Sequence, residues 1–251
     1  MDPEAIEPPP PPPVLPGERH LVVPRIARDR AEARILAEIC DGPFRPPDAR
    51  VAATIEPAQA LFVPFWRVDI RRWDDAKRLE EERLGYAGIP VGLGPGDPST
   101  AWMVCAQRAF PYEIKHPGSM IPSDSRPVLV HASSLQPGDP DPSYGWTIVD
   151  ADVDQGTGRA LAIAAYRRLS LDAGALLAQL EQIETAVHTL HFVWYPVWFA
   201  RYRYQGQNAP TRDGLFHVGI SAVDETCIAA VHPSKLQAGA ARIKKLFGFG
   251  G

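Results

Sequence analysis

Two segments of this 251-residue sequence share one strand-like pattern, and that pattern constrains the fold more than any other feature. In the first segment Pro64 is followed by Trp66, and in the second Pro196 is followed by Trp198. Proline has no N–H to donate to a sheet ladder, so it marks the start or edge of a strand. A tryptophan two residues further on points to the same face and buries a large area. We therefore expect Pro64, Trp66, Pro196 and Trp198 to be structural anchors of two strands.

The two strands, predicted at 61–71 and 190–204, carry these anchors 132 positions apart, about half the chain. This spacing suggests an internal pseudo-repeat of two half-domains; a coincidence between two aromatic strands is the alternative. In the first strand the alternation predicts that Trp66, Val68 and Ile70 face the core. The same alternation places Phe65, Arg67, Asp69 and Arg71 on the opposite face.

The rest of the sequence mixes helical and strand patterns without a strict alternation of the two. Apolar spacing and stop signals predict helices at 25–40, 161–169, 171–187 and 234–247, with a short charged helix at 73–84. Further strands are predicted at 20–23, 101–110, 126–131 and 146–153, the last ended by Gly156 and Gly158, and a hairpin joins 215–223 to 227–232. Because hairpins and prolines at strand positions favour antiparallel pairing, we predict an α+β fold with mostly antiparallel sheet and a few packing helices.

Composition shifts divide the predicted chain into four parts. Residues 1–18 form a proline-rich tail that we expect to be disordered, with an unbroken proline run at 8–13 that serves as a spacer or as a ligand for a proline-binding module. A first α+β half is predicted at 19–135 and a second at 136–247, the second ending in an amphipathic helix. Residues 248–251 are predicted to be a flexible end.

The overall composition is that of an ordinary globular protein, with 45% hydrophobic residues, 22% charged residues and a net charge of −4. A broad nucleic-acid-binding face would normally bring a basic excess. The three cysteines are single and far apart, which fits neither a disulfide framework nor a zinc-binding spacing. The N-terminus lacks the pattern of a signal peptide, and no apolar run is long enough to span a bilayer. We expect a cytoplasmic protein.

No residue pattern predicts catalysis, a metal or a cofactor. The glycine-rich stretch at 92–96 lacks the Lys-Ser/Thr of a phosphate-binding loop. His188 and His191 have no third ligand nearby in the sequence, and the proximity of His131 to Ser133 does not establish a catalytic pair. The sequence therefore favours a binding role over an enzyme, and an enzyme with a site dispersed along the chain stays open.

Two stretches are candidate binding surfaces. The predicted C-terminal helix has an apolar stripe beside lysines, a pattern suited to a protein partner or a membrane surface, although packing on its own sheet is an alternative. The candidate partner-binding residues are Leu236, Ile243, Lys244, Lys245, Phe247 and Phe249. In the second anchor strand, arginines interleave with tyrosines at Arg201, Tyr202, Arg203 and Tyr204. That pattern can bind single-stranded nucleic acid, or it can be an ordinary amphipathic strand.

The C-terminal part also resembles a module of uncharacterised bacterial proteins. The resemblance rests on 195–198, on Tyr202 to Gly206, and on a hairpin that reaches Pro233 and Ser234. The pattern of those proteins is roughly Pro-x-Trp, Tyr-x-Tyr-x-Gly, a hairpin and then Pro-x-Ser. Those proteins often carry a zinc ribbon, absent here, and are described loosely as helicase-like. The resemblance implies a fold and no established activity.

Three functional hypotheses follow. The first is a non-enzymatic adaptor or structural component of a bacterial multiprotein assembly, acting through a protein partner or self-assembly. The second is a single-stranded nucleic-acid-binding module that uses 201–204. The third is an enzyme whose site the sequence does not reveal.

Overall fold

The computed structural model describes residues 18–41, 45–70, 100–112, 128–171, 187–206 and 215–233. Its helices are α1 (Arg28–Cys40), α2 (Ala49–Ala52) and α4 (Gln155–Leu171), with 3-10 turns at Ala132–Ser134 and Pro142–Tyr144. Its strands are β1 (Arg19–Val22), β2 (Ala53–Ile55), β3 (Gln59–Ile70), β4 (Thr100–Cys105), β5 (Leu129–His131), β6 (Leu135–Pro137), β7 (Thr147–Ile148), β8 (Val187–Tyr204), β9 (Leu215–Ser221) and β10 (Cys227–Val231). These elements confirm the predicted α+β class.

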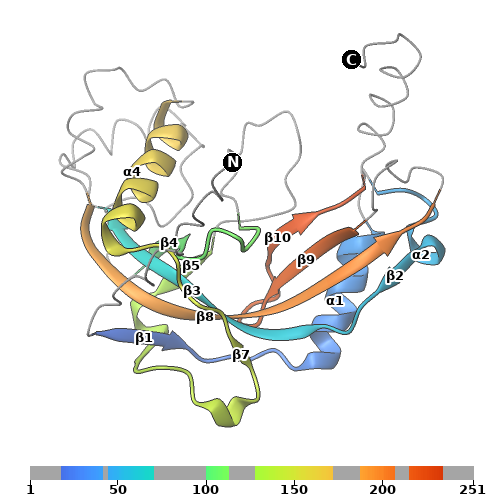
Figure 1. Ribbon diagram of the computed structural model, residues 1–251, viewed down its shortest axis with the longest axis horizontal. Coiled ribbons are helices and arrows are strands. Elements are labelled where there is room, and N and C mark those ends of the chain that lie inside the picture. Colours follow the sequence, from blue (N-terminus) through green and yellow to red (C-terminus); the bar gives the residue numbers. More distant parts are fainter. Residues whose placement is uncertain are drawn as a thin grey trace, which may run out of the picture.

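The long strands β3 and β8 form the middle of one sheet, shown bowed in Figure 1. They pair antiparallel, and the strand order across the sheet is β10-β9-β8-β3-β4-β5. Each Pro-x-Trp proline lies opposite an aromatic residue of the other strand: Pro64 faces Trp194, and Pro196 faces Phe62. The two predicted halves therefore share a single sheet.

Three short strands pair with the long strand of the other half: β1 and β2 pair with β8, the latter antiparallel, and β7 pairs with β3. β1, from the first half, pairs parallel with β8, and β7, from the second half, pairs parallel with β3. The other strand pairs are antiparallel. Each half thus adds its first strand to the long strand of the other half.

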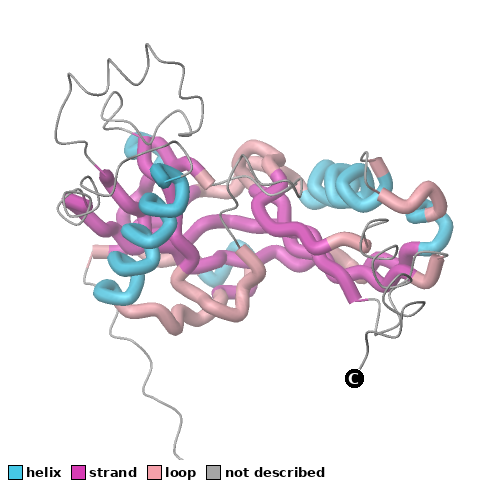
Figure 2. The backbone as a smooth tube through the Cα atoms, turned by 90° about the horizontal axis from the view of Figure 1, so that it is seen from above, coloured by secondary structure: helices cyan, strands magenta, loops and turns pink. Residues whose placement is uncertain are grey.

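One face of the long strands packs under the two long helices, which lie at opposite ends of the sheet in Figures 1 and 2. Near α4 this face carries Trp66 and Phe192, and near α1 it carries Trp198 and Tyr202. Trp66 lies directly opposite Phe192, and Trp198 and Tyr202 lie an even number of residues from Phe192 in the same strand, so the strand alternation places all four on one side. Trp146 contacts both clusters and joins them over the middle of the sheet.

The opposite face is also core, so the predicted outward orientation of Phe65 and Arg67 is wrong. Phe65 is fully buried and Arg67 is 5% exposed. Side chains of β5 and β10, from the two ends of the strand order, meet in this second cluster, including Val130 and Ile228. A sheet that curls this way buries both faces of its central strands, and a strict in-out alternation no longer applies.

The predicted strand at 146–153 is also wrong in length. Only Thr147–Ile148 pair, and Gly156 and Gly158 lie inside α4 instead of ending a strand. The Asp154 carboxylate accepts hydrogen bonds from the Thr157 N–H at 2.9 Å and the Thr157 hydroxyl at 2.7 Å, so it caps the helix start. At Gly158 a Cβ atom would lie 2.5 Å from Trp66 Cδ1, so the glycine allows the helix to approach the sheet.

The first strand, the first helix and the C-terminal hairpin agree with the structure within a few residues, whereas the strand predicted at 101–110 ends at Cys105 and the helix predicted at 161–169 begins at Gln155 and continues to Leu171. The first helix starts at Arg28 and buries Ile35 and Ile39, while Leu36 is 40% exposed. The C-terminal hairpin is confirmed, with Glu225 in its turn at a φ of +62°. The helices predicted at 73–84 and 234–247, most of that at 171–187, and the tail before residue 18 lie outside the described residues.

Candidate functional site

The two anchor tryptophans are core residues, each tied to a distant backbone carbonyl. Trp66 is fully buried, and its indole N–H donates to the Val153 carbonyl at 3.0 Å. Trp198 is 7% exposed, and its indole N–H donates to the Ile26 carbonyl at 2.9 Å. Their environment is that of structural anchors, with the polar end of each ring satisfied inside the protein.

The arginines and tyrosines of the predicted nucleic-acid strand lie on opposite sides of β8. Arg201 and Arg203 are exposed, whereas Tyr202 and Tyr204 are buried in the cluster beneath α1. Base stacking needs an accessible aromatic face, which neither tyrosine offers in this fold. Glu56 follows β2 directly, and its N–H donates to the Arg201 carbonyl, which brings an acidic residue beside the arginines.

Tyr202 and Tyr204 instead form a polar cluster with groups from other elements, which we call the tyrosine cluster (Tyr202, His232, Tyr204 and Asp48). The Tyr202 hydroxyl lies 2.7 Å from His232 Nδ1, just past the end of β10. The Tyr204 hydroxyl donates to Asp48 Oδ1 at 2.6 Å, in the turn before α2. The cluster therefore ties the end of β8 both to the chain after β10 and to the chain before α2.

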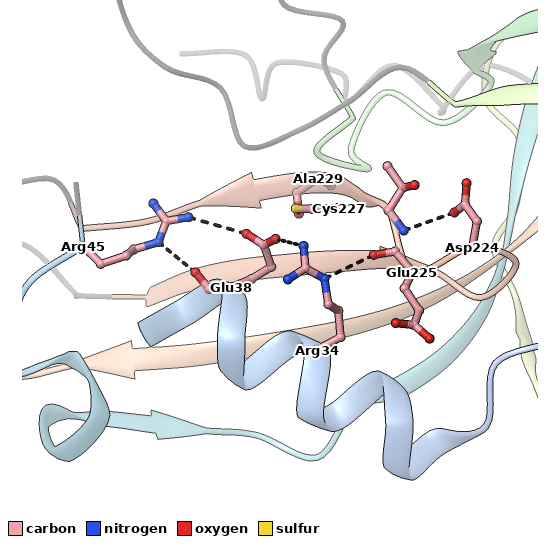
Figure 3. Close-up of polar contacts among 8 residues, drawn as sticks. Arg34, Glu38, Arg45, Asp224, Glu225, Cys227 and Ala229 are labelled. Carbon is pink, nitrogen blue, oxygen red and sulfur yellow. Dashed lines mark hydrogen bonds and ion pairs between the residues drawn. The ribbon is translucent and has the colours of Figure 1, made fainter. Parts of the chain in front are cut away.

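A second polar group, shown in Figure 3, runs along α1 and is called the ion-pair chain here (Arg45, Glu38, Arg34 and Glu225). Arg45 Nε donates to the Glu38 carbonyl at 2.8 Å, and its guanidinium lies 3.7 Å from the Glu38 carboxylate. Glu38 also pairs with Arg34, whose Nε donates to the Glu225 carbonyl at 3.4 Å. The ion-pair chain thus connects α1 with the β9–β10 turn and with the start of the 45–48 segment.

Arg30 adds an ion pair to the Glu225 carboxylate. Glu225 is a non-glycine residue in the left-handed region, a conformation that costs roughly 1–2 kcal/mol when unsupported. Two arginines of α1 hold both its carbonyl and its side chain. Arg45 and Glu38 are largely buried, so removal of either partner would leave an uncompensated charge.

The buried or largely buried side chains of His232, Cys105, Tyr112 and Tyr195 are held in their neutral forms. Burial, with smaller contributions from the Arg45 charge and from His217, lowers the pKa of His232 to about 3. Burial raises the pKa of Cys105 to about 12, and burial also raises the pKa values of Tyr112 and Tyr195. Tyr195 shares a 2.7 Å hydrogen bond with the buried Ser221 hydroxyl. These shifts all move away from neutral pH, whereas an acid–base catalyst needs a pKa near it.

The other chemical candidates of the sequence are spread over the sheet. His131 Nδ1 lies 2.7 Å from the Ser133 hydroxyl, but the same nitrogen accepts the Ser133 N–H at 3.2 Å, as a cap of the following 3-10 turn. The ring of His191 contacts that of His20 at a centroid distance of 5.6 Å. Within the described ranges, no three His, Cys, Asp or Glu side chains gather in a way that could hold a metal ion.

The candidate partner-binding residues Leu236, Ile243, Lys244, Lys245, Phe247 and Phe249 lie outside the described residues. The described chain stops at Pro233, one residue after His232 of the tyrosine cluster. None of the helices in the described segments has the length and apolar character needed to cross a membrane.

Sequence reasoning missed the partners that complete these two groups. Glu38 lies in α1, Arg45 and Asp48 lie in the segment before α2, and His232 follows β10, and no local motif marks them. One signal was present in the sequence. Tyr202 and Tyr204 lie four and six residues after Trp198 in the same strand, so the alternation of side chains places them on the same helix-covered face as Trp198.

Comparisons with protein-family models, with characterised proteins and with solved structures find no match to this chain. The resemblance to bacterial zinc-ribbon-linked proteins therefore stays a prediction from sequence. The functional conclusion depends on the geometry of the chain itself.

Proposed function

We propose that the protein is a non-enzymatic adaptor in a bacterial multiprotein assembly, acting in the cytoplasm through its C-terminal segment. The sheet and α1 form the support, and the apolar stripe of 236–249 makes the contact with a protein partner. This proposal combines two observations: the amphipathic sequence pattern of the segment and the fixed position of His232, just past β10.

The observation that carries the proposal is the hydrogen bond between the Tyr202 hydroxyl and His232 Nδ1. It fixes the chain four residues before Leu236, the first residue of the stripe. A binding segment that starts from a fixed point has fewer conformations to lose when it binds, which raises affinity. The neutral state of His232, Cys105, Tyr112 and Tyr195 is further support for a binding role.

The ion-pair chain supports the same arrangement from the other side of β10. Through Arg34 and Glu225 it ties the β9–β10 turn to α1. At its other end is Arg45, whose charge contributes to the lowered pKa of His232. Both ends of β10 are therefore held by side-chain contacts. The strand that leads into the binding segment is held to the body of the protein.

The test is quantitative capture from native cells with the tagged full-length chain as bait. Deletion of 236–251 should remove the specific partner, and deletion of 1–18 should leave it. Within the full chain, Ile243→Asp should lower capture at least roughly tenfold, since it places a charge in the apolar stripe. Ala241→Asp adds the same charge off the stripe and should change capture little.

Equal capture by the full chain and by the chain lacking 236–251 would contradict the proposal. So would equal effects of Ile243→Asp and Ala241→Asp. Size-exclusion chromatography with light scattering of the full chain and these variants separates partner binding from self-assembly. Only self-assembly gives the isolated chain a mass above that of a monomer.

A further inference from the structure

We propose that the chain consists of two joined copies of one β-α-β-β-β unit. The surface through which each copy contacts the other is therefore complementary to a second copy of the same unit. The first copy is β1-α1-β3-β4-β5 and the second is β7-α4-β8-β9-β10. The copies pair as a symmetric dimer would, with their first strands exchanged. The inference goes beyond the proposed adaptor role and is independent of it.

The pairing of β3 with β8 has a local two-fold axis. Val63 lies opposite Tyr195, which is also its counterpart in the second copy, 132 residues further along the chain. Leu61 lies opposite Val197, and Phe65 lies opposite Val193, so each pair maps onto the other under the same spacing. The strand order β10-β9-β8-β3-β4-β5 has the same symmetry, because β8, β9 and β10 follow one another on one side of this axis as β3, β4 and β5 do on the other.

The tryptophans make the same contact in both copies. Trp66 donates to the carbonyl of Val153, two residues before α4 begins, and Trp198 donates to the carbonyl of Ile26, two residues before α1 begins. Each long strand therefore binds the helix start of the other copy through one indole N–H. The two acceptors are 127 positions apart in the sequence.

The backbone around each proline repeats as well. The Ala106 N–H donates to the Pro64 carbonyl at 2.8 Å, and the Ala222 N–H donates to the Pro196 carbonyl at 3.0 Å. Each of these alanines then accepts two N–H groups at the approach to a helix: Ala106 from Asp152 and Val153 at 2.9 and 3.1 Å, and Ala222 from Arg25 and Ile26 at 2.7 and 2.9 Å. Both donor pairs keep the 127-residue spacing.

The buried helix positions follow the same spacing. Ala31 of α1 matches Gly158 of α4, and Ile35 matches Ala162. Ala31, Ile35 and Ala162 are at most 1% exposed, and Gly158 lies against Trp66. The N–H groups of Ala31 and Gly158 each bond to the carbonyl four residues earlier, at the first turn of their helix.

The last strands of the two copies also match, in structure and in sequence. Val130 pairs with Ala101 of β4, and Val231 pairs with His217 of β9, at positions that correspond when β4 and β9 are aligned by their pairing with the long strands. Both valines begin a Val-His-x-Ser sequence, 130–133 and 231–234. A second short motif thus recurs at the corresponding place.

The spacing between copies is constant inside each element and changes only between elements. It is 127 from the first strand through the helix, 132 in the long strand, 116 in the next strand and 101 in the last. Insertions and deletions in the connections of two copies of one ancestral unit produce this pattern, because loops tolerate length changes and packed elements do not.

The test is a register-specific graft in the full-length chain. Replacing 25–31 by the sequence of 152–158 should give a protein that still unfolds cooperatively, with the melting temperature lowered by less than roughly 10 °C. The control inserts the sequence of 150–156, which has the same length but is shifted by two residues. It should lower the melting temperature further or abolish the transition. Equal behaviour of the two grafts, folded or unfolded, overturns the inference.

A second measurement uses the unmodified chain and needs no variant to fold. Hydrogen exchange of the two indole N–H groups, followed by nitrogen-15 NMR, should show Trp66 and Trp198 both protected, with rates within about tenfold of each other, since both open only when a helix start leaves the sheet. Protection of one indole with free exchange of the other overturns the equivalence.

Discussion

Trp66 and Trp198 make the same hydrogen bond, yet they pack against different helix residues. Trp66 meets Gly158 of α4, where no Cβ would fit, and Trp198 lies in the cluster that contains Ala31 of α1. The matched histidines, at the end of β5 and just past the end of β10, differ more: His131 is exposed and bonds to Ser133, whereas His232 bonds to the buried Tyr202. Contacts common to both halves are those the sheet requires. Contacts that differ between the halves, such as the bond of His232 to Tyr202, are free to serve function.

The largest expected effect tests the shared part of this comparison. Trp66→Ala and Trp198→Ala should each lower the free energy of unfolding by about 3–5 kcal/mol, because each removes a large buried ring and its hydrogen bond. Urea unfolding followed by circular dichroism measures both. Leu36→Ala, at a partly exposed position of α1, is the control and should cost much less. A small loss for one tryptophan beside a large loss for the other would break the equivalence.

The next effect tests the difference at the helix contacts. Gly158→Ala should destabilise the protein by about 1–3 kcal/mol, since the new methyl group forces α4 away from Trp66. Ala31→Gly should cost about 1 kcal/mol, the usual helix cost of glycine. Thermal unfolding of both variants distinguishes them. Stabilisation by Gly158→Ala, as helix propensity alone predicts, would show that the close approach of α4 is not needed.

A third effect compares the two matched histidines through pH. The pKa of His232 is lowered when the protein is folded, so the unfolded chain takes up this proton first as the pH falls below about 6.5. Stability due to His232 is therefore full above that pH and is lost as the pH falls toward 3, with a slope of at most about 1.4 kcal/mol per pH unit.

Urea unfolding between pH 7 and pH 4.5 measures this slope in wild type, His232→Gln and His131→Gln. His232→Gln should flatten the curve, and His131→Gln, at an exposed position outside the tyrosine cluster, is the matched control. Because carboxylates titrate in the same range, the informative quantity is the difference between the two variants. Parallel curves for both would remove the distinction drawn between the two histidines.

The smallest effect concerns the helix starts. α4 is capped by Asp154, and the matched residue at the start of α1 is Ala27, whose side chain makes no capping bond. Ala27→Asp should stabilise the protein by about 1 kcal/mol, and Asp154→Ala should destabilise it by a similar amount. Differential scanning calorimetry resolves both shifts. Ala27→Asn, which caps without a charge, separates the hydrogen bond from the helix dipole.

The local features of the fold were predictable because they are written in short stretches of sequence. The anchor strands follow from Pro-x-Trp, α1 from the spacing of Ile35 and Ile39, and the C-terminal hairpin from its turn. The burial of Phe65 and Arg67 could not be predicted, because it depends on the curl that brings Val130 and Ile228 over the same face. Nothing near Arg67 in the sequence carries that information.

The candidate site was less predictable than the fold. The interleaved Arg201 to Tyr204 pattern suggested one surface, but the strand divides it between solvent and core. The groups that bond to the tyrosines, Asp48 and His232, lie 156 and 30 residues away from their partners. Polar contacts at such separations are decided by the topology of the sheet, which single-sequence patterns do not contain.

The exchange of first strands has a consequence for synthesis of the protein. β1 lies near the start of the chain, and its parallel partner, β8, begins at Val187. At a typical synthesis rate of about 5–20 residues per second, roughly 10 to 30 s pass before that partner exists. Throughout this time β1 lacks its parallel partner, and the buried face of α1 lacks the β8 side chains of its cluster, including Trp198 and Tyr202. The N-terminal half is therefore expected to need shielding on the ribosome, and folding of the sheet can be completed only after β8 has emerged.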